Sequence, residues 1–148
     1  NLGLGHTRLA IQDLSEAGHQ PMQSQDGLRQ IVFNGEIYNF PELRNTLQRD
    51  GIRFRTGTDT EVLLEGFSVW GIEGLLKRCV GMFAFALWDR ELRRLTLARD
   101  RLGIKPLYYG LMNGVFLFAS ELKALRVHPS FHGEVDRAAL VDVGRGKR

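Results

Sequence analysis

Cysteine is almost absent from this sequence, since Cys79 is the single one among 148 residues. A disulfide within the chain is therefore excluded. Long apolar runs are lacking too, because charged residues interrupt every hydrophobic stretch well before the ~18 residues that a membrane helix needs. Residues 1–6 have neither a basic start nor an apolar stretch, so they do not resemble a secretory signal peptide. We therefore expect a cytoplasmic protein with no membrane association.

An excess of charge of one sign is also lacking over most of the chain. The formal net charge is +3, from 20 basic and 17 acidic residues. Residues 144–148 contain three of the basic groups and no acid, which leaves 17 against 17 elsewhere. A nucleic-acid surface requires positive charge gathered on a folded face, so we expect no nucleic-acid partner. We expect one folded domain over residues 1–140, and a basic tail or the start of an interdomain linker at 141–148.

Several motifs of catalysis and cofactor binding are missing. The sequence has no phosphate-binding loop, no dinucleotide-binding glycine fingerprint and no Gly-x-Ser-x-Gly. His128 and His132 are four residues apart, but Pro129 breaks the helix that would align them, so we expect no metal site. Cys79 stands at the start of an apolar strand, where we expect a buried thiol rather than a nucleophile.

Hydrophobic periodicity predicts alternating strands and helices. Asn34-Gly35 between two apolar runs predicts a type I′ hairpin turn, because both central residues of that turn need positive φ. Asn39 and Glu42 have the spacing of a helix N-cap and its third residue, and Thr58 and Glu61 repeat that spacing. A short strand with a loop is predicted over residues 3–14. Further strands are predicted over residues 28–34, 82–88, 95–99, 107–111 and 115–118, with a tight turn at Asn113-Gly114. The predicted helices cover residues 40–50, 59–78 with an interruption at Gly71, 121–126 and 137–141.

The strand at 82–88 is apolar on both faces and must be covered on both. Together with the predicted hairpins, which pair strands antiparallel, it indicates an α+β fold with helices over packed sheets.

Polar residues in predicted turns are the candidates for binding chemistry. They are Arg8, Asn34-Gly35-Glu36 and Asp59. An arginine can hold an α-carboxylate in a bidentate fork, while carboxylates can hold an α-ammonium group. Backbone N–H groups and an Asn amide can stabilise an oxyanion. Taken by themselves, the same residues are better explained by a surface arginine, an ordinary Asn-Gly turn and a helix cap at Asp59.

Five motifs in fixed order add a resemblance to a known family. They are Gly5-His6-Thr7-Arg8-Leu9-Ala10-Ile11, Phe33-Asn34-Gly35-Glu36-Ile37-Tyr38-Asn39, Thr56-Gly57-Thr58-Asp59-Thr60-Glu61-Val62, the run 81–89 and the run 98–109. Through them the chain resembles the class II, N-terminal nucleophile (Ntn) glutamine amidotransferase domain of glutamine-hydrolysing asparagine synthetases. The resemblance extends from Leu4 to about Leu140.

The resemblance implies a four-layer αββα sandwich of two antiparallel sheets, with glutamine as the substrate. It implies that Arg8 binds the glutamine α-carboxylate, and that the backbone of Leu9, Ala10, Ile11 and Gln12 lines that pocket. Asn34 and the Gly35 N–H would form the oxyanion hole, and Glu36 and Asp59 would hold the α-amino group. The segment from Arg99 to Pro106 would have a structural role only.

The sequence departs from the family pattern at the nucleophile. The family begins with a cysteine whose thiol attacks the glutamine amide, and this sequence has none at the matching place. We therefore expect a fragment of a larger enzyme that lacks its first strand and is inactive alone. The parent would carry a synthetase domain that binds ATP and Mg²⁺, with no cofactor in the present domain.

Two alternatives stay open beside that expectation. One is an amidotransferase domain that serves a different ammonia acceptor, and the other is a non-catalytic scaffold or binding module of the same fold. The resemblance also leaves homo-oligomerisation open.

Overall fold

The computed structural model describes residues 2–7 and 18–133. The chain divides into two compact units, Asn1–Pro106 and Leu107–Arg148.

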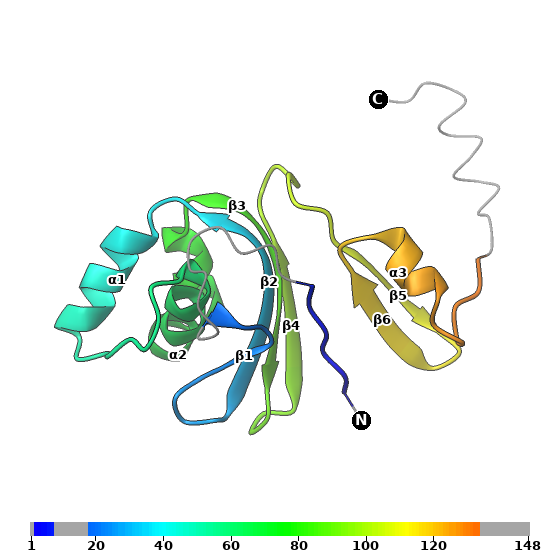
Figure 1. The fold of residues 1–148 in the computed structure, drawn as a ribbon, viewed down its shortest axis with the longest axis horizontal. Helices are drawn as coiled ribbons and strands as arrows, with labels where there is room; N and C mark the ends of the chain where they lie inside the picture. The colour runs from blue at the N-terminus through cyan, green and yellow to red at the C-terminus, as the bar shows by residue number, and fades with distance from the viewer. Residues whose placement is uncertain (1, 8–17, 134–148) are drawn as a thin grey trace. The chain divides into compact units, whose positions relative to one another are not determined.

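The first unit is built on a four-stranded antiparallel sheet with the order β1-β2-β3-β4 (Figure 1). Its strands are β1 (Met22–Gln23), β2 (Arg29–Ile37), β3 (Gly81–Asp89) and β4 (Arg94–Arg99). The long central pair runs in register from Arg29 opposite Asp89 to Ile37 opposite Gly81. Alternation places Phe33 and Ile37 of β2 on the buried side of the strand.

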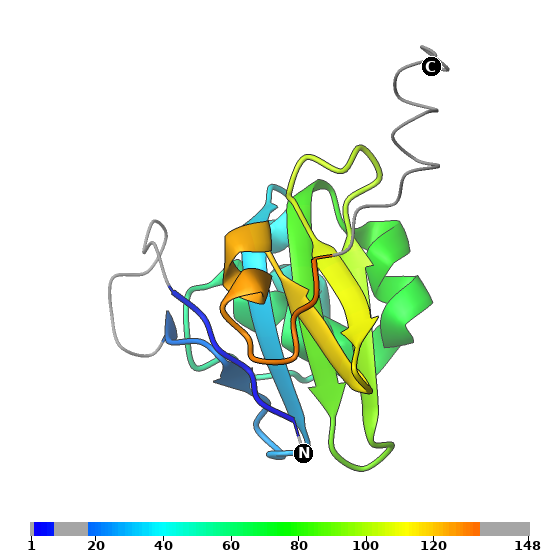
Figure 2. The ribbon, with the colours of Figure 1, turned by 90° about the vertical axis from the view of Figure 1, so that its right-hand side faces the viewer.

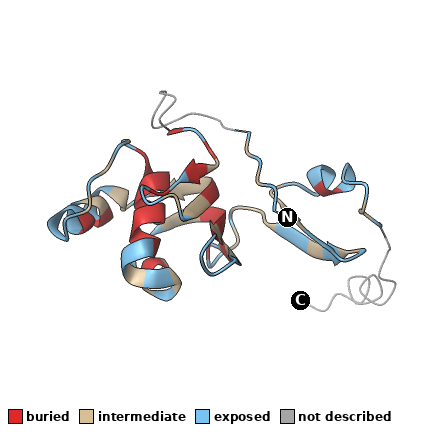
Figure 3. Ribbon diagram, turned by 90° about the horizontal axis from the view of Figure 1, so that it is seen from below, coloured by how far each residue is buried: buried red, intermediate tan, exposed pale blue. Residues whose placement is uncertain are grey.

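Two helices cover one face of this sheet. Helix α2 (Asp59–Arg78) packs against β1 and β2, and α1 (Phe40–Arg49) packs on α2 (Figure 1). Buried residues concentrate between α2 and the sheet (Figure 3). The core cluster includes Phe33, Leu47, Leu63, Phe85 and Leu87. Burying each such side chain stabilises the fold by about 1.5–3 kcal/mol.

Local signals in the sequence explain how α2 begins and bends. Thr58 is its N-cap, and its side chain accepts a hydrogen bond from the Glu61 N–H, as predicted. Gly71 has non-helical backbone angles (φ 66°, ψ 178°), which confirms the predicted interruption.

The second unit contains a β-hairpin and a short helix. Strands β5 (Tyr108–Met112) and β6 (Val115–Ala119) pair antiparallel, and α3 (Leu122–Arg126) lies against β6 (Figure 2). Asn113 and Gly114 both have positive φ, which confirms the predicted tight turn. Two antiparallel sheets with helices confirm the predicted α+β class.

The predicted hairpin turn at Asn34-Gly35 is wrong. Both residues lie inside β2, which continues to Ile37 and pairs with β3 rather than with the residues that follow it. Gly35 is needed for another reason, since a Cβ there would lie 2.2 Å from the Met82 carbonyl oxygen and 2.7 Å from the Phe83 Cα. The glycine permits close approach of two strands instead of a turn.

The predicted capping pair of Asn39 and Glu42 is also wrong. Asn39 is the N-cap of α1 but makes no side-chain capping bond. Its amide instead donates to the Arg78 carbonyl and accepts from the Val80 N–H, both at 2.9 Å. Asn39 therefore ties the start of α1 to the connection between α2 and β3.

In the segment 3–14, which was predicted to contain a short strand and a loop, residues 3–7 are outside any strand and residues 8–14 lie outside the described part. The helix predicted over 137–141 also lies outside it. Strand β1 was not predicted.

Candidate functional site

The candidate site lies where β2 ends beside the first turn of α2. Three alternate residues of β2, Phe33, Gly35 and Ile37, direct their backbone N–H groups away from β3. The direction of the Gly35 groups follows from its partner, because the N–H and C=O of Phe83 are both engaged by Asp100 on the opposite side of β3. Gly35 and Phe83 are therefore a non-hydrogen-bonded pair of the antiparallel ladder.

Two of these three outward N–H groups are occupied. The Phe33 N–H donates to Gln20 Oε1 at 2.6 Å, and the Ile37 N–H donates to Asp59 Oδ2 at 3.0 Å. The Gly35 N–H lies between them and has no hydrogen-bond partner within residues 2–7 and 18–133. A half-buried backbone N–H held between two fixed neighbours is a preorganised hydrogen-bond donor for a ligand oxygen.

Two carboxylates come together at this end of β2. Asp59 is buried in the first turn of α2, and burial raises the pKa of its carboxyl above the ordinary value. The N–H groups of Ile37, Thr60 and Asp59 itself act in the opposite direction, while the negative charge of Glu36 raises this pKa further. The electrostatic repulsion between Glu36 and Asp59 would be relieved by a cation placed between them.

Alternation along β2 places Asn34 on the same face as Glu36. The structure therefore brings together Asn34, Gly35, Glu36 and Asp59, four of the residues that the sequence singled out. Arg8, Leu9, Ala10, Ile11 and Gln12 lie outside the described residues.

Glu61 holds the turn that leads into Asp59. The sequence predicted Glu61 only as the third residue of the α2 cap and not in this role. Its side chain is completely buried. It accepts hydrogen bonds from the Arg55 N–H (2.9 Å), the Thr56 N–H (2.7 Å) and the Thr56 hydroxyl (2.7 Å). Thr56 in turn shares a 2.9 Å hydrogen bond with Thr58, the N-cap. Glu61 thereby fixes residues 55–58 and, with them, the start of α2.

Gln20 is a residue beside the site that the sequence did not predict. Besides accepting from Phe33, it donates through Nε2 to the Thr60 hydroxyl at 3.4 Å. It therefore bridges β2 and α2 beside the site. No local pattern could have identified it, because both partners are far away in the sequence.

The segment after β4 has the hydrogen bonding expected for a structural role. The Asp100 carboxylate accepts from the N–H groups of Phe83, Ile104 and Lys105 at 2.8–3.2 Å. The Arg99 guanidinium donates to the Lys105 carbonyl at 2.6 Å. These bonds fold the loop back onto the start of β3.

Cys79 is buried, as predicted, and burial raises the pKa of its thiol to about 11. A thiol with that pKa carries very little thiolate at neutral pH, so it is poorly suited to nucleophilic attack. The described part of the chain contains no group of three His, Cys, Asp or Glu side chains that could hold a metal ion. Among the same residues, no helix combines the length and apolar character needed to cross a membrane.

Comparison with known proteins places these residues in a family. A family model described as a glutamine amidotransferase domain matches residues 1–145. The glutamine-hydrolyzing asparagine synthetase 3 of Bacillus subtilis is 43% identical over 141 residues, which are 94% of this chain and 23% of that protein. The putative asparagine synthetase 2 of Methanocaldococcus jannaschii is 42% identical over 139 residues, with coverages of 84% and 26%.

Solved structures give the same assignment. The glutamine phosphoribosylpyrophosphate amidotransferase of B. subtilis is similar, with a TM-score of 0.71 and 28% identity over 82% of this chain and 28% of that one. This likeness confirms the predicted Ntn-hydrolase type of α+β fold. The chain spans about a quarter of the length of the curated relatives named above. Its sequence and its fold agree, and the chain belongs to the glutamine amidotransferase domain family.

Proposed function

We propose that the end of β2 binds glutamine and that the Gly35 N–H donates a hydrogen bond to the side-chain carbonyl oxygen of the glutamine. The observation that carries this proposal is the Gly35 donor, which has no hydrogen-bond partner among the described residues and lies between two occupied donors. The side-chain amide of Asn34 supplies the second donor. Glu36 and Asp59 receive the α-ammonium group, whose positive charge offsets their mutual repulsion.

Arg8 is the proposed partner of the glutamine α-carboxylate, and the backbone from Leu9 to Gln12 the proposed wall beside it. This assignment depends on the match of Gly5-His6-Thr7-Arg8 to the family motif. With it, the two charged ends of the amino acid meet opposite charges and the amide end meets the oxyanion donors. Such an arrangement selects an amino acid with a side-chain amide over a simple amide.

In the parent protein we propose hydrolysis by a cysteine that this sequence does not contain. Its sulfur would attack the amide carbon, and the carbonyl π electrons would move onto the oxygen facing Gly35 and Asn34. The proton lost by the thiol would pass, through the cysteine's own α-amine, to the amide nitrogen, so that cleavage of the C–N bond releases ammonia and leaves a thioester. Water would then hydrolyse the thioester to glutamate and restore the thiol. Cys79 cannot replace that cysteine, because it is buried and its thiol pKa is about 11. The chain alone should therefore bind glutamine without hydrolysing it.

The ammonia acceptor we propose is an activated aspartate, in a synthetase domain that uses ATP and Mg²⁺. Support comes from asparagine synthetases of B. subtilis and M. jannaschii at 42–43% identity, against 28% for the phosphoribosylpyrophosphate amidotransferase. The latter remains the reason to consider another acceptor. Asparagine formation by the parent protein from glutamine, aspartate and ATP decides between the two, since another acceptor predicts glutamate release that aspartate does not stimulate.

Calorimetric titration of the chain with L-glutamine tests the binding proposal. We expect one site, and we expect Arg8→Ala to weaken it by about 2–3 kcal/mol, or roughly 30- to 150-fold, because a bidentate charge-assisted contact is lost. Arg90→Ala is the matched control, since this exposed arginine lies just after β3. Equal affinity in the wild type and in Arg8→Ala would show that Arg8 does not bind the carboxylate.

A further inference from the structure

We propose that a hollow beside the C-terminal end of α2 binds a small amphipathic carboxylate, meaning a molecule with an apolar body and one terminal carboxylate. The hollow has a volume of about 550 Å³, within the ~300–1,000 Å³ range of small-molecule sites. The proposal is argued independently of glutamine binding, because none of the described residues of the glutamine site, Asn34, Gly35, Glu36 and Asp59, lines this hollow.

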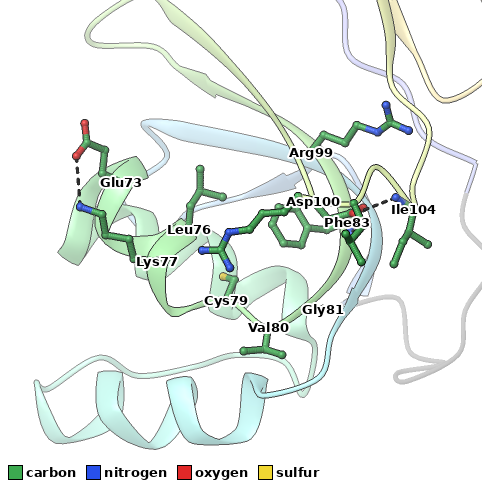
Figure 4. A pocket seen from close by; sticks show the side chains of 12 residues that line it. Glu73, Leu76, Lys77, Cys79, Val80, Gly81, Phe83, Arg99, Asp100 and Ile104 are labelled. Carbon is green, nitrogen blue, oxygen red and sulfur yellow. Dashed lines mark hydrogen bonds and ion pairs between the residues drawn. The ribbon is translucent and has the colours of Figure 1, made fainter. Parts of the chain in front are cut away.

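Three segments of the first unit form the walls (Figure 4). Leu76 comes from the last turns of α2, Cys79 from the connection that follows α2, and Phe83 from the start of β3. Leu102 and Ile104 come from the loop after β4. Leu102 is 86% exposed, the highest value for a large hydrophobic side chain in the described part of the chain. Exposed apolar side chains gathered around a concavity are typical of a binding surface, whereas single ones are ordinary.

The wall formed by the loop is held in place without a ligand. Asp100 accepts from the N–H groups of Phe83, Ile104 and Lys105, which joins both sides of the hollow through one carboxylate. Arg99 closes the loop from outside by donating to the Lys105 carbonyl. The hollow is therefore largely preformed, and binding would need little ordering of the chain.

The charges around the hollow favour an anion. Among the described residues that line it, three basic ones, Lys77, Arg99 and Arg101, face two acidic ones, Glu73 and Asp100, which gives these residues a net charge of +1. Both acidic groups are engaged, since Glu73 lies 3.8 Å from Lys77 and Asp100 accepts three backbone N–H groups.

Arg101 is the basic residue of the hollow best placed to bind a ligand carboxylate. Within the described residues its guanidinium has no hydrogen bond or ion pair, whereas Arg99 is held by backbone carbonyls. A ligand carboxylate would therefore meet Arg101 at the rim, with Lys77 close by, while its apolar body fills the hollow.

Titration of the 148-residue chain with octanoate, followed by ¹⁵N NMR, tests this site. We expect saturable shifts of the amides from Cys79 to Phe83 and from Arg101 to Ile104. Octanamide, which has the same apolar body without the charge, should bind at least fivefold more weakly. Absence of saturable binding, shifts centred elsewhere, or equal affinity for the two compounds would each overturn the proposal.

Two exposed positions provide variants with matched controls. Arg101→Gln should weaken octanoate binding about fivefold and Ile104→Asp should abolish it. Arg90→Gln and Leu92→Asp make the same chemical changes at the opposite end of β3 and should leave the affinity unchanged. Thermal unfolding checks that all four variants are folded. Octanoate binding that persists in folded Arg101→Gln and Ile104→Asp at wild-type strength would place the ligand elsewhere.

Discussion

Replacing Glu61 by Gln is the substitution that most sharply tests how the candidate site is held. The two side chains have nearly the same volume, so the core packing of α2 is kept. The substitution changes the acceptors and the charge: one carboxylate oxygen becomes an NH₂ group that faces backbone and hydroxyl donors, and the ion pair with the Arg55 guanidinium at 3.6 Å is lost. Glu61 accepts from the Arg55 N–H, the Thr56 N–H and the Thr56 hydroxyl, and its side chain is fully buried.

The expected loss follows from these bonds. The amide oxygen of Gln can keep the Arg55 bond, while the two bonds of Thr56 to Glu61 Oε2 are lost. Hydrogen bonds to a charged group contribute about 1.5–3 kcal/mol each, so we expect a destabilisation of about 3 kcal/mol or more. For a chain of this length that corresponds to a fall in Tm of roughly 10 °C.

Glu73→Gln is the matched control, because it makes the same change on the same helix at an exposed position. Glu73 has one ion pair with Lys77 at 3.8 Å, which should contribute less than about 0.5 kcal/mol. Thermal and guanidinium unfolding followed by circular dichroism measure both variants. If Glu61→Gln unfolds within 1 °C of Glu73→Gln, Glu61 does not fix residues 55–58 as described here.

Three further predictions concern single residues. Glu65→Gln should raise the free energy of unfolding by about 1 kcal/mol at pH 7, because burial raises the pKa of Glu65 and its buried Oε1 has no hydrogen-bond partner among the described residues. The folded state then binds the Glu65 proton more tightly than the unfolded state, so this wild-type residue loses stability as pH rises above the ordinary value of 4.5. The difference in free energy of unfolding between Glu65→Gln and the wild type should therefore shrink toward pH 4, and a difference that stays constant with pH would contradict this prediction. Gly35→Ala should cost about 3 kcal/mol or more, since its Cβ would lie 2.2 Å from a backbone oxygen, whereas Gly57→Ala has open space; similar denaturation midpoints would refute this. Asn39→Ala should cost about 1 kcal/mol in thermal unfolding and Glu42→Ala less than half of that, whereas the reverse order would restore the capping pair.

Local signals correctly predicted one helix cap, one helix break and one turn of this fold. The Thr58 cap, the break at Gly71 and the tight turn at Asn113-Gly114 each depend on the conformational preference of one or two residues, and the structure confirms all three. The apolar run of β3 likewise predicted a buried strand. The structure confirms this, because five consecutive residues from Phe83 to Leu87 are buried.

Partners distant in the sequence explain the errors. Asn34-Gly35 has the preference of a turn, but pairing of all nine residues of β2 with β3 overrides it. Asn39 bonds to the chain some forty residues later rather than to its own helix. In both cases contacts with distant parts of the chain replace the local interaction that the sequence predicted.

The candidate site was predicted in part for the same reason. The resemblance to the family identified Asn34, Gly35, Glu36 and Asp59, which the structure brings together. Gln20 was missed, and Glu61 was predicted only as the third residue of the α2 cap. The remaining hydrogen bonds of both residues form only when β2, α2 and residues 55–58 meet.

Glutamine binding at the end of β2 is tested most directly by the Gly35 amide resonance during an NMR titration of the chain. L-glutamine should move the Gly35 amide proton downfield, as expected for a donor that gains an acceptor, and should also shift Ile37 and Thr60. D-glutamine should leave the three resonances in place, because its α-ammonium group cannot reach Glu36 and Asp59 while the amide faces Gly35. Saturable L-glutamine binding that leaves Gly35 unshifted, or no binding at all by a folded chain, would contradict the proposed site.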